Sequence, residues 1–292
     1  MENNVKIVAG YIINQPFYKE AEIKQYLDNI ATYINQVDYL YIYNTTTSPL
    51  TEFLERLSKY PMVEYANCPE YGEAEIYQEV INQGLKRGAD YVTYLAPGYF
   101  YEDSSLSELK KYLLTADTTN LAVITPMPLY ACQIHERKAE EFRTVKGCRL
   151  LGALLNLKLY PESNGIRTEY YQTTFDYEYC LQLRSKGYYV MLAQNLVLRN
   201  QNYKVITRKL GMIKLSAYDR DLMDVYYETR NRYYLWKEYK TIDYDYVKLD
   251  KKLARREKQE IRTRDKHYKE KFRMMKKAKV DYKQKHLGRY VE

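Results

Sequence analysis

Two carboxylates two residues apart, Asp176 and Glu178 in the stretch FDYEYC, are the first candidates for chemistry in this chain of 292 residues. The stretch opens an apolar helical pattern over about residues 175–186. A carboxylate held at the start of a helix could take a proton from a hydroxyl group. Two structural interpretations stay open: Asp176 as the N-cap of the helix, and Glu178 as a solvated charge in its first turn, where the helix dipole favours acids.

The cysteines and histidines offer no second reactive centre. The cysteine spacings match neither a metal site nor a redox pair, and no histidine is paired with a cysteine as a base. We therefore expect reduced thiols and discount a Cys/His hydrolase. These residues are Cys68, Cys132, Cys148, Cys180, His135, His267 and His286.

The elements that must position the carboxylates follow an alternating pattern. Strands and helices alternate from residue 5 to about residue 125, which predicts an α/β fold with a mixed, mostly parallel sheet flanked by helices. Ligands lie beyond the carboxyl ends of such strands, so we expect a site at the loops 14–16, 43–48 and 96–99. The predicted strands cover 5–13, 37–43, 62–65, 90–95, 121–125, 188–192 and 196–199, and the predicted helices 19–35, 73–87, 104–114 and 175–186.

Five segments, taken in order, resemble the family 2 glycosyltransferases, and especially their bacterial rhamnosyltransferase-like branch. The resemblance covers about 240 residues and implies a GT-A-like fold, related to the Rossmann fold. It also implies transfer of a sugar from a nucleotide donor to an acceptor hydroxyl with inversion. The segments are VKIVAGYIINQP, VDYLYIYNTTTS, YGEAEIYQEVINQGLKRGADYVTYLAPG, TTFDYEYCLQLRSKGYYVML and YYETRNRYYLWKEY.

The resemblance assigns roles to residues near the predicted loops. It places Asp176 where the family has its catalytic base, and Glu178 on the acceptor side. The arginine expected shortly after the glutamate is replaced by Gln182, with Arg184 nearby. The residues that the resemblance places at the nucleotide are Asn14, Tyr43 and Asn44.

The donor side departs from the family pattern at three places. Tyr43 stands where the family has an aspartate for the nucleotide base, and Ala96 and Gly98 occupy the two acidic positions of the family's DxD metal loop. The late strand continues with Arg199 and Asn200 in place of a histidine. We therefore expect no metal or other cofactor; Mg²⁺ or Mn²⁺ would need ligands outside this loop.

Two further expectations follow from the departures. Arg199 or lysine side chains could neutralise a diphosphate directly. We expect Glu102 and Asp103 to cap the next helix rather than to bind a metal.

The charge is concentrated at the end of the chain. Residues 248–292 contain 18 lysines and arginines against seven acidic residues, a net charge of +11, whereas the whole chain carries +8 and the remainder is slightly acidic. We divide the chain into a domain at 1–240 and a basic helical extension at 241–292. An anionic membrane surface and a helix packed on the body or on a partner chain are both open interpretations of the extension, and nucleic acid ranks below them.

Two functional hypotheses remain. The first is a cytoplasmic glycosyltransferase of surface-polysaccharide or glycoprotein assembly, acting on a glycan, lipid-linked or protein acceptor, peripheral to the inner face of the membrane if the tail binds there. The second is a catalytically inactive relative that binds a partner glycosyltransferase, a glycan or an acceptor protein. The N-terminus lacks the pattern of a signal peptide. The 36 tyrosines, against six phenylalanines, fit core filling better than sugar-binding platforms.

Overall fold

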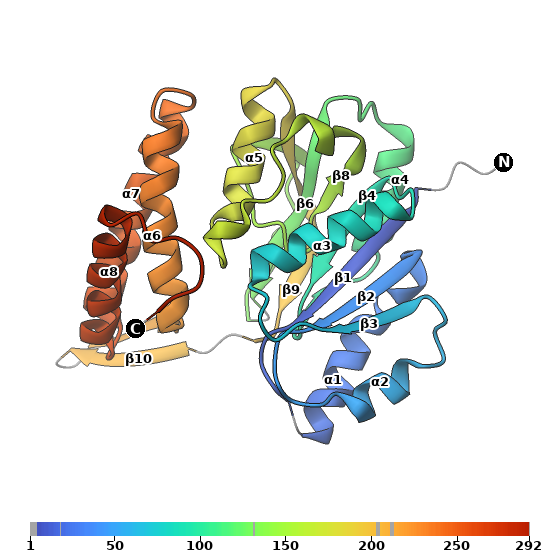
Figure 1. Ribbon diagram of the computed structural model, residues 1–292, viewed down its shortest axis with the longest axis horizontal. Coiled ribbons are helices and arrows are strands. Elements are labelled where there is room, and N and C mark those ends of the chain that lie inside the picture. Colours follow the sequence, from blue (N-terminus) through green and yellow to red (C-terminus); the bar gives the residue numbers. More distant parts are fainter. Residues whose placement is uncertain (1–4, 18, 131, 203–204, 211–212, 292) are drawn as a thin grey trace.

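A computed structural model describes residues 5–17, 19–130, 132–202, 205–210 and 213–291. Its described residues contain a nine-stranded mixed sheet in the order β3-β2-β1-β4-β8-β6-β9-β5, with β7 paired to β9 (Figure 1). The pairs of β1 with β2 and β4, of β2 with β3 and of β6 with β9 are parallel; β5, β7 and β8 pair in the antiparallel sense. The strands are β1 Ile7–Ile13, β2 Tyr39–Asn44, β3 Val63–Asn67, β4 Tyr91–Leu95, β5 Tyr99–Tyr101, β6 Leu121–Tyr130, β7 Phe142–Val145, β8 Leu154–Asn156 and β9 Tyr189–Asn200.

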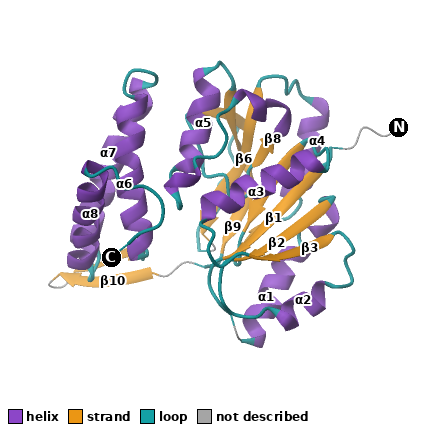
Figure 2. Ribbon diagram, in the orientation of Figure 1, coloured by secondary structure: helices purple, strands orange, loops and turns teal. Residues whose placement is uncertain are grey.

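Helices cover both faces of this sheet (Figure 2). The side chains of α1, α2 and α4 contribute to one buried cluster, and those of α3 and α5 to a second cluster on the opposite face. The predicted fold class, a mostly parallel sheet between helices, is confirmed. The helices are α1 Glu20–Ala31, α2 Thr51–Leu57, α3 Glu73–Lys86, α4 Ser105–Thr115 and α5 Phe175–Ser185, with short 3-10 helices η1 Ile34–Gln36, η2 Leu157–Glu162 and η3 Thr168–Tyr170.

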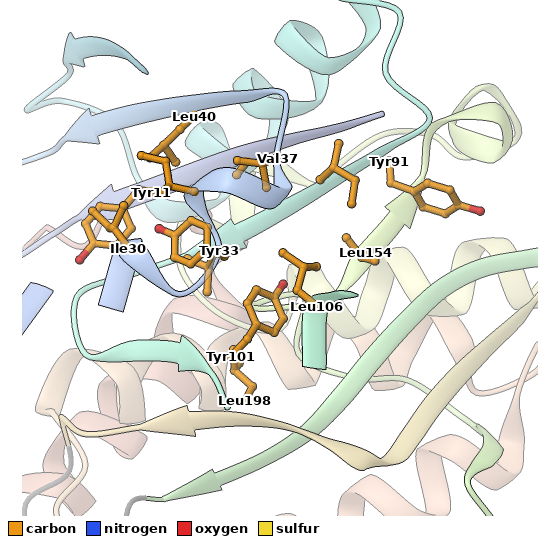
Figure 3. Close-up of a cluster of buried hydrophobic side chains, with 14 of the residues drawn as sticks. Tyr11, Ile30, Tyr33, Val37, Leu40, Tyr91, Tyr101, Leu106, Leu154 and Leu198 are labelled. Atoms are coloured by element: carbon orange, nitrogen blue, oxygen red, sulfur yellow. The ribbon is translucent and has the colours of Figure 1, made fainter. Parts of the chain in front are cut away.

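Strand β1 shows why the two faces differ. Ile7, Tyr11 and other alternate residues point into the first cluster, which Figure 3 shows, and Val8 and Ile12 point into the second. Gly10 belongs to the second face, where an added Cβ would lie 2.4 Å from a methyl group of Val80, so the glycine lets α3 approach the sheet closely at this point. Alternation of apolar residues buried on both sides is what a central strand requires.

Tyrosine fills much of this core. It accounts for nine of the twelve largest fully buried side chains. The core-filling interpretation of the tyrosine-rich composition is therefore confirmed.

A C-terminal lobe stands beside the sheet, at the left of Figure 1. It consists of a β10–β11 hairpin and three helices, of which α6 packs along α8 and α7 contacts β11. A buried cluster that includes Leu181 of α5 and Leu235 of α6 joins this lobe to the body. The elements are β10 Val205–Leu210, β11 Ile213–Tyr218, α6 Leu222–Tyr239, α7 Tyr244–Arg264 and α8 Tyr268–Lys283.

The lobe extends across the expected boundary at residue 240, because α6 before it packs on α8 after it; the division into 1–240 and 241–292 stays a prediction. The hairpin and strands β5, β7 and β8 were missed by the sequence pattern, and β9 is one strand where two were predicted. Within the described residues, no helix is sufficiently long and apolar to cross a membrane.

Candidate functional site

The loop after β4 is a tight β-turn. The Tyr99 N–H donates to the Ala96 carbonyl over 3.0 Å, and Gly98 has a φ of +80°. Proline at the second position and glycine at the third, as in Ala96–Pro97–Gly98–Tyr99, form a type II turn. Asn202 closes the turn from outside: its Nδ2 donates to the Pro97 carbonyl over 2.6 Å. An added Cβ at Gly98 would lie 2.3 Å from the Asn202 side chain, so the turn leaves no room for a second acidic residue.

Asp176 lies in the first turn of α5, behind a strained loop. The N-cap of the helix is Thr174, so the interpretation of Asp176 as the N-cap is wrong. Tyr171, Thr173 and Thr174 all have φ between +55° and +68°. β-Branched residues are rare in this region of φ, and such strain is stored mainly at functional sites.

Asn231 of α6 holds the strained loop in place. It is completely buried, and its Nδ2 donates to the carbonyls of Tyr170, Gln172 and Thr173 over 2.9–3.2 Å. The neighbouring Arg230, also buried, donates to the Tyr170 carbonyl over 3.2 Å. The C-terminal lobe therefore fixes the backbone that leads into Asp176.

Arg149 is the centre of a charged cluster at this place. Its Nε lies 3.6 Å from Oδ2 of Asp176, which is only 3% exposed, whereas 51% of the Arg149 side chain is exposed. Burial raises the pKa of Glu73 at the start of α3 and of Asp224 at the start of α6, and the nearby Arg149 guanidinium opposes both shifts. The cluster therefore joins α3, α5 and α6 around one cation that solvent can reach.

Burial raises the pKa values of the carboxyl groups in this cluster. Burial raises the pKa of Asp176, and the Arg149 guanidinium opposes this shift. Burial raises the pKa of Glu73 to about 7, with Arg149 opposing and Asp176 adding to the shift. Burial also raises the pKa of Tyr99, the last residue of the turn, to about 12, and the Arg149 guanidinium opposes this shift too. Carboxylates with raised pKa values around an accessible cation are typical of proton-transfer sites.

Glu178 and Arg184 are engaged elsewhere. Successive helical residues turn by about 100°, so Glu178 leaves α5 on the side away from Asp176. It is fully buried, which excludes the interpretation as a solvated charge, and it accepts hydrogen bonds from Tyr239 (2.8 Å) and Gln182 (2.7 Å). Arg184 pairs over 2.5 Å with Asp243, the N-cap of α7. Both side chains join α5 to the lobe, and their predicted acceptor role stays a prediction.

The residues predicted at the nucleotide lie at the ends of β1 and β2. Asn14 is exposed directly after β1. Asn44 is buried and organises its own loop: its Nδ2 donates to the Ser48 carbonyl and its Oδ1 accepts from Thr46. Tyr43 packs in the core with 3% exposure, so its ring is closed to stacking in this conformation. Asn14 is thus the member of the three that a ligand can reach directly.

Arg199 does not join the cluster. It forms a two-bond pair with Glu102, at 2.9 and 3.0 Å, and the same guanidinium donates to the Gln133 carbonyl. The N-cap of α4 is Ser104, so the expectation that Glu102 and Asp103 cap this helix is wrong. Arg199 is therefore occupied by protein groups, and the cation near Asp176 is Arg149 instead.

A divalent cation does not fit the turn. Ala96 and Gly98 supply no carboxylates, and the described part of the chain contains no group of three or more His, Cys, Asp or Glu side chains arranged to hold a metal.

Three members of the cluster were missed by the sequence pattern. Arg149 lies in the irregular region 126–175, Asp224 in a helix that lacks a strong apolar stripe, and Glu73 in a stretch identified only as a helix start. One feature of the sequence could have indicated Glu73: it is the first residue of the helix that precedes β4 in the chain.

No family model and no curated protein matches the sequence. Among solved structures, the chain is similar to GalNAc-T7 with UDP, GalNAc and Mn²⁺, at a TM-score of 0.52 and 9% identity over 69% of this chain and 44% of that chain. It is also similar to S. aureus TarS 1-349, at a TM-score of 0.49 and 9% identity over 68% of this chain and 60% of that chain. The chain therefore spans less than two thirds of each. The first likeness confirms the predicted GT-A fold, a glycosyltransferase fold.

Proposed function

We propose that the protein is a family 2-type glycosyltransferase, close to the rhamnosyltransferase-like branch, that transfers a sugar from a nucleotide donor to an acceptor hydroxyl. The observation that carries this proposal is Asp176, buried at the end of a strained loop and 3.6 Å from the accessible cation Arg149. A vestigial site would have no reason to keep this strain, which costs on the order of 1–3 kcal/mol for each such residue.

In the proposed reaction Asp176 accepts the proton of the acceptor hydroxyl. The hydroxyl oxygen forms the new bond to the anomeric carbon, and the bond from that carbon to the donor phosphate breaks, so the nucleoside diphosphate leaves with the electron pair. A single displacement of this kind inverts the configuration at that carbon. The raised pKa of Asp176 makes it a stronger base than an ordinary aspartate.

Arg149 is proposed to stabilise the leaving diphosphate. Its ion pair with Asp176 runs through Nε at 3.6 Å, and Arg149 forms no ion pair with any other residue that the structure describes. Guanidinium groups bind phosphate oxygens through two parallel hydrogen bonds. The terminal nitrogens can therefore take the charge that a metal ion takes in transferases with acidic metal loops.

The acceptor is proposed to be a glycan, lipid-linked glycan or protein of surface-polysaccharide or glycoprotein assembly. Because the donor is a nucleotide sugar, the reaction is proposed to take place in the cytoplasm. If the acceptor is lipid-linked, it would take place at the inner face of the membrane. We keep a second candidate, a non-catalytic protein that binds a partner transferase or a glycan. The turn Ala96–Tyr99 favours it, because the turn lacks every acidic side chain of the family pattern.

Release of nucleoside diphosphate tests the proposal. Purified protein is incubated with UDP-glucose, UDP-N-acetylglucosamine, GDP-mannose or dTDP-rhamnose, with water as the acceptor. We expect release from one donor, and Asp176→Asn should lower the rate at least about 100-fold. Asp28→Asn, on the exposed side of α1, is the matched control and should keep the rate. An unchanged rate in Asp176→Asn would reject Asp176 as the base, and no release from any donor would favour the non-catalytic candidate.

A further inference from the structure

A groove of about 1,030 Å³ runs between α6, α7 and α8. Its aromatic residues are half-buried: Tyr233 stacks on Tyr282 with ring centres 5.1 Å apart, and meets Trp236 edge-on at 5.4 Å. Phe272 adds a fourth ring on α8. The groove therefore presents flat apolar surfaces in a depression between three helices that lie side by side in Figure 1.

The charge of the groove is strongly positive. Eleven lysines and arginines line it against two glutamates, Glu228 and Glu257. Both glutamates are already paired, with Arg232 and Arg220 at 2.5–3.5 Å. None of the other nine cations forms an ion pair with a residue in the described ranges. The groove thus holds a surplus of positive charge that the protein does not neutralise itself.

The cations without an acidic partner come from all three helices, and two of them, Lys251 and Lys258, lie over the rings of Trp236 and Phe272. Lys237 extends from α6 and Lys240 from its C-cap, Lys251 and Arg255 from α7, and Arg273 and Lys276 from α8. Like charges on three packed helices repel one another, and their repulsion disfavours the packing. An anionic ligand would neutralise these charges and remove the repulsion, so the groove is complementary in charge to an anion.

The groove begins beside the candidate active site. Glu228 lines it, and lies one helical turn after Asp224 of the Arg149 cluster on the same face of α6. Val225, at the same end, directly follows Asp224 of the Arg149 cluster. A chain bound along the groove would therefore point one end towards Asp176.

We propose that this groove binds an anionic glycan, a chain of sugars that carries phosphate or carboxylate groups, and guides it to the site as the acceptor. The proposal rests on the proposed function. The lysines and arginines would bind the anionic groups, and the rings would pack on the apolar faces of the sugars. A concave groove fits an extended chain, whereas a bilayer presents a flat surface and requires an apolar face for insertion.

The chain offers a direct readout, because Trp236 is its only tryptophan and lines the groove. Its fluorescence is followed while oligogalacturonate is added, with a neutral maltooligosaccharide of the same length as the control. Oligogalacturonate should bind and change the Trp236 emission, binding should weaken with salt, and the neutral chain should not bind. Inorganic polyphosphate tests charge alone, and is expected to bind more weakly because it lacks sugar faces.

Two triple variants with the same change of charge distinguish binding in the groove from binding to the basic C-terminal region in general. K251E/R255E/K276E reverses three cations of the groove, and should weaken oligogalacturonate binding at least about tenfold. K252E/K266E/K283E reverses three exposed cations of the same region that do not line the groove, and should keep the affinity within about threefold. Circular dichroism establishes that both variants are folded.

Four results would overturn the proposal: equal losses in the two variants, equal affinity for polyphosphate and oligogalacturonate, binding of oligo(dT) alone, or binding of phosphatidylglycerol vesicles alone. The last two would assign the groove to nucleic acid or to a membrane. The titration needs no donor and no turnover. Glycan binding without release of nucleoside diphosphate would therefore reject the proposed function but keep the glycan-binding role of the groove. Release without glycan binding would reject the role of the groove but keep the proposed function.

Discussion

Glu73→Gln removes the carboxylate with the pKa of about 7 from the Arg149 cluster. Folding disfavours the charged form of Glu73, because burial raises its pKa above the ordinary 4.5. Below pH 4.5 the group is protonated in both states and has no effect on stability. As the pH rises from 4.5 to 7 the unfolded chain ionises first, so the free energy of unfolding falls, and above pH 7 the loss is complete.

The difference between these pKa values corresponds to about 3 kcal/mol, and the partial solvent contact of Glu73 reduces the expected loss to about 2 kcal/mol. The variant should therefore match the wild type near pH 4.5 and exceed its free energy of unfolding by about 2 kcal/mol above pH 7.

Urea unfolding at several pH values from 4.5 to above 7 measures this difference. Glu70→Gln, an exposed carboxylate before the same helix, is the control and should stay within about 0.5 kcal/mol of the wild type throughout. A constant difference between Glu73→Gln and the wild type at every pH, or a variant less stable than the wild type above pH 7, would refute the description of the cluster.

Two other substitutions test the supports of the site and the tyrosine core. Asn231→Leu removes the side-chain donor that three backbone carbonyls of the strained loop share, although Arg230 still donates to the Tyr170 carbonyl. Urea unfolding should show a loss of about 2–4 kcal/mol, and a loss below about 1 kcal/mol would contradict this role of Asn231. Tyr33→Phe removes a buried hydroxyl that has no hydrogen-bond partner within the described structure, and should raise the melting temperature. Tyr101→Phe is its counterpart and should lower the melting temperature, since this hydroxyl bonds Thr93 and Gly152 at 2.9 and 3.0 Å; the same sign for both would refute the assignment.

The parallel part of the fold was predictable because its signals are local. Apolar runs such as residues 5–13 become central strands, and the turn residues Pro97 and Gly98 stand where a turn forms. The antiparallel strands β5, β7 and β8 have three or four residues each, too few for a periodic pattern. Their existence depends on pairing with strands far along the chain, which no local pattern encodes.

The site was predictable only in part. Asp176 was found because it begins a helix in a recognisable segment, whereas Arg149 lies in an irregular region and enters the cluster through tertiary packing alone. Arg199 pairs with Glu102, a residue 97 positions away in the chain. No local pattern shows this pairing, so Arg199 was predicted as a ligand for phosphate although its guanidinium already binds a carboxylate. The interpretation of Glu178 as a solvated charge was wrong for a related reason, since the burial of a charge near a helix start depends on the helices that cover it.

The central claim is a donor site that works through Arg149 rather than through a metal ion. The most direct measurement is calorimetric titration of the wild type and of Arg149→Gln with UDP, GDP and dTDP, each with Mn²⁺ and with a chelator. We predict that one nucleotide binds the wild type equally well under both conditions, and that Arg149→Gln weakens its binding at least about tenfold. Binding that requires Mn²⁺, or binding that Arg149→Gln leaves unchanged, would contradict the account, and no binding of any nucleotide would favour the non-catalytic candidate.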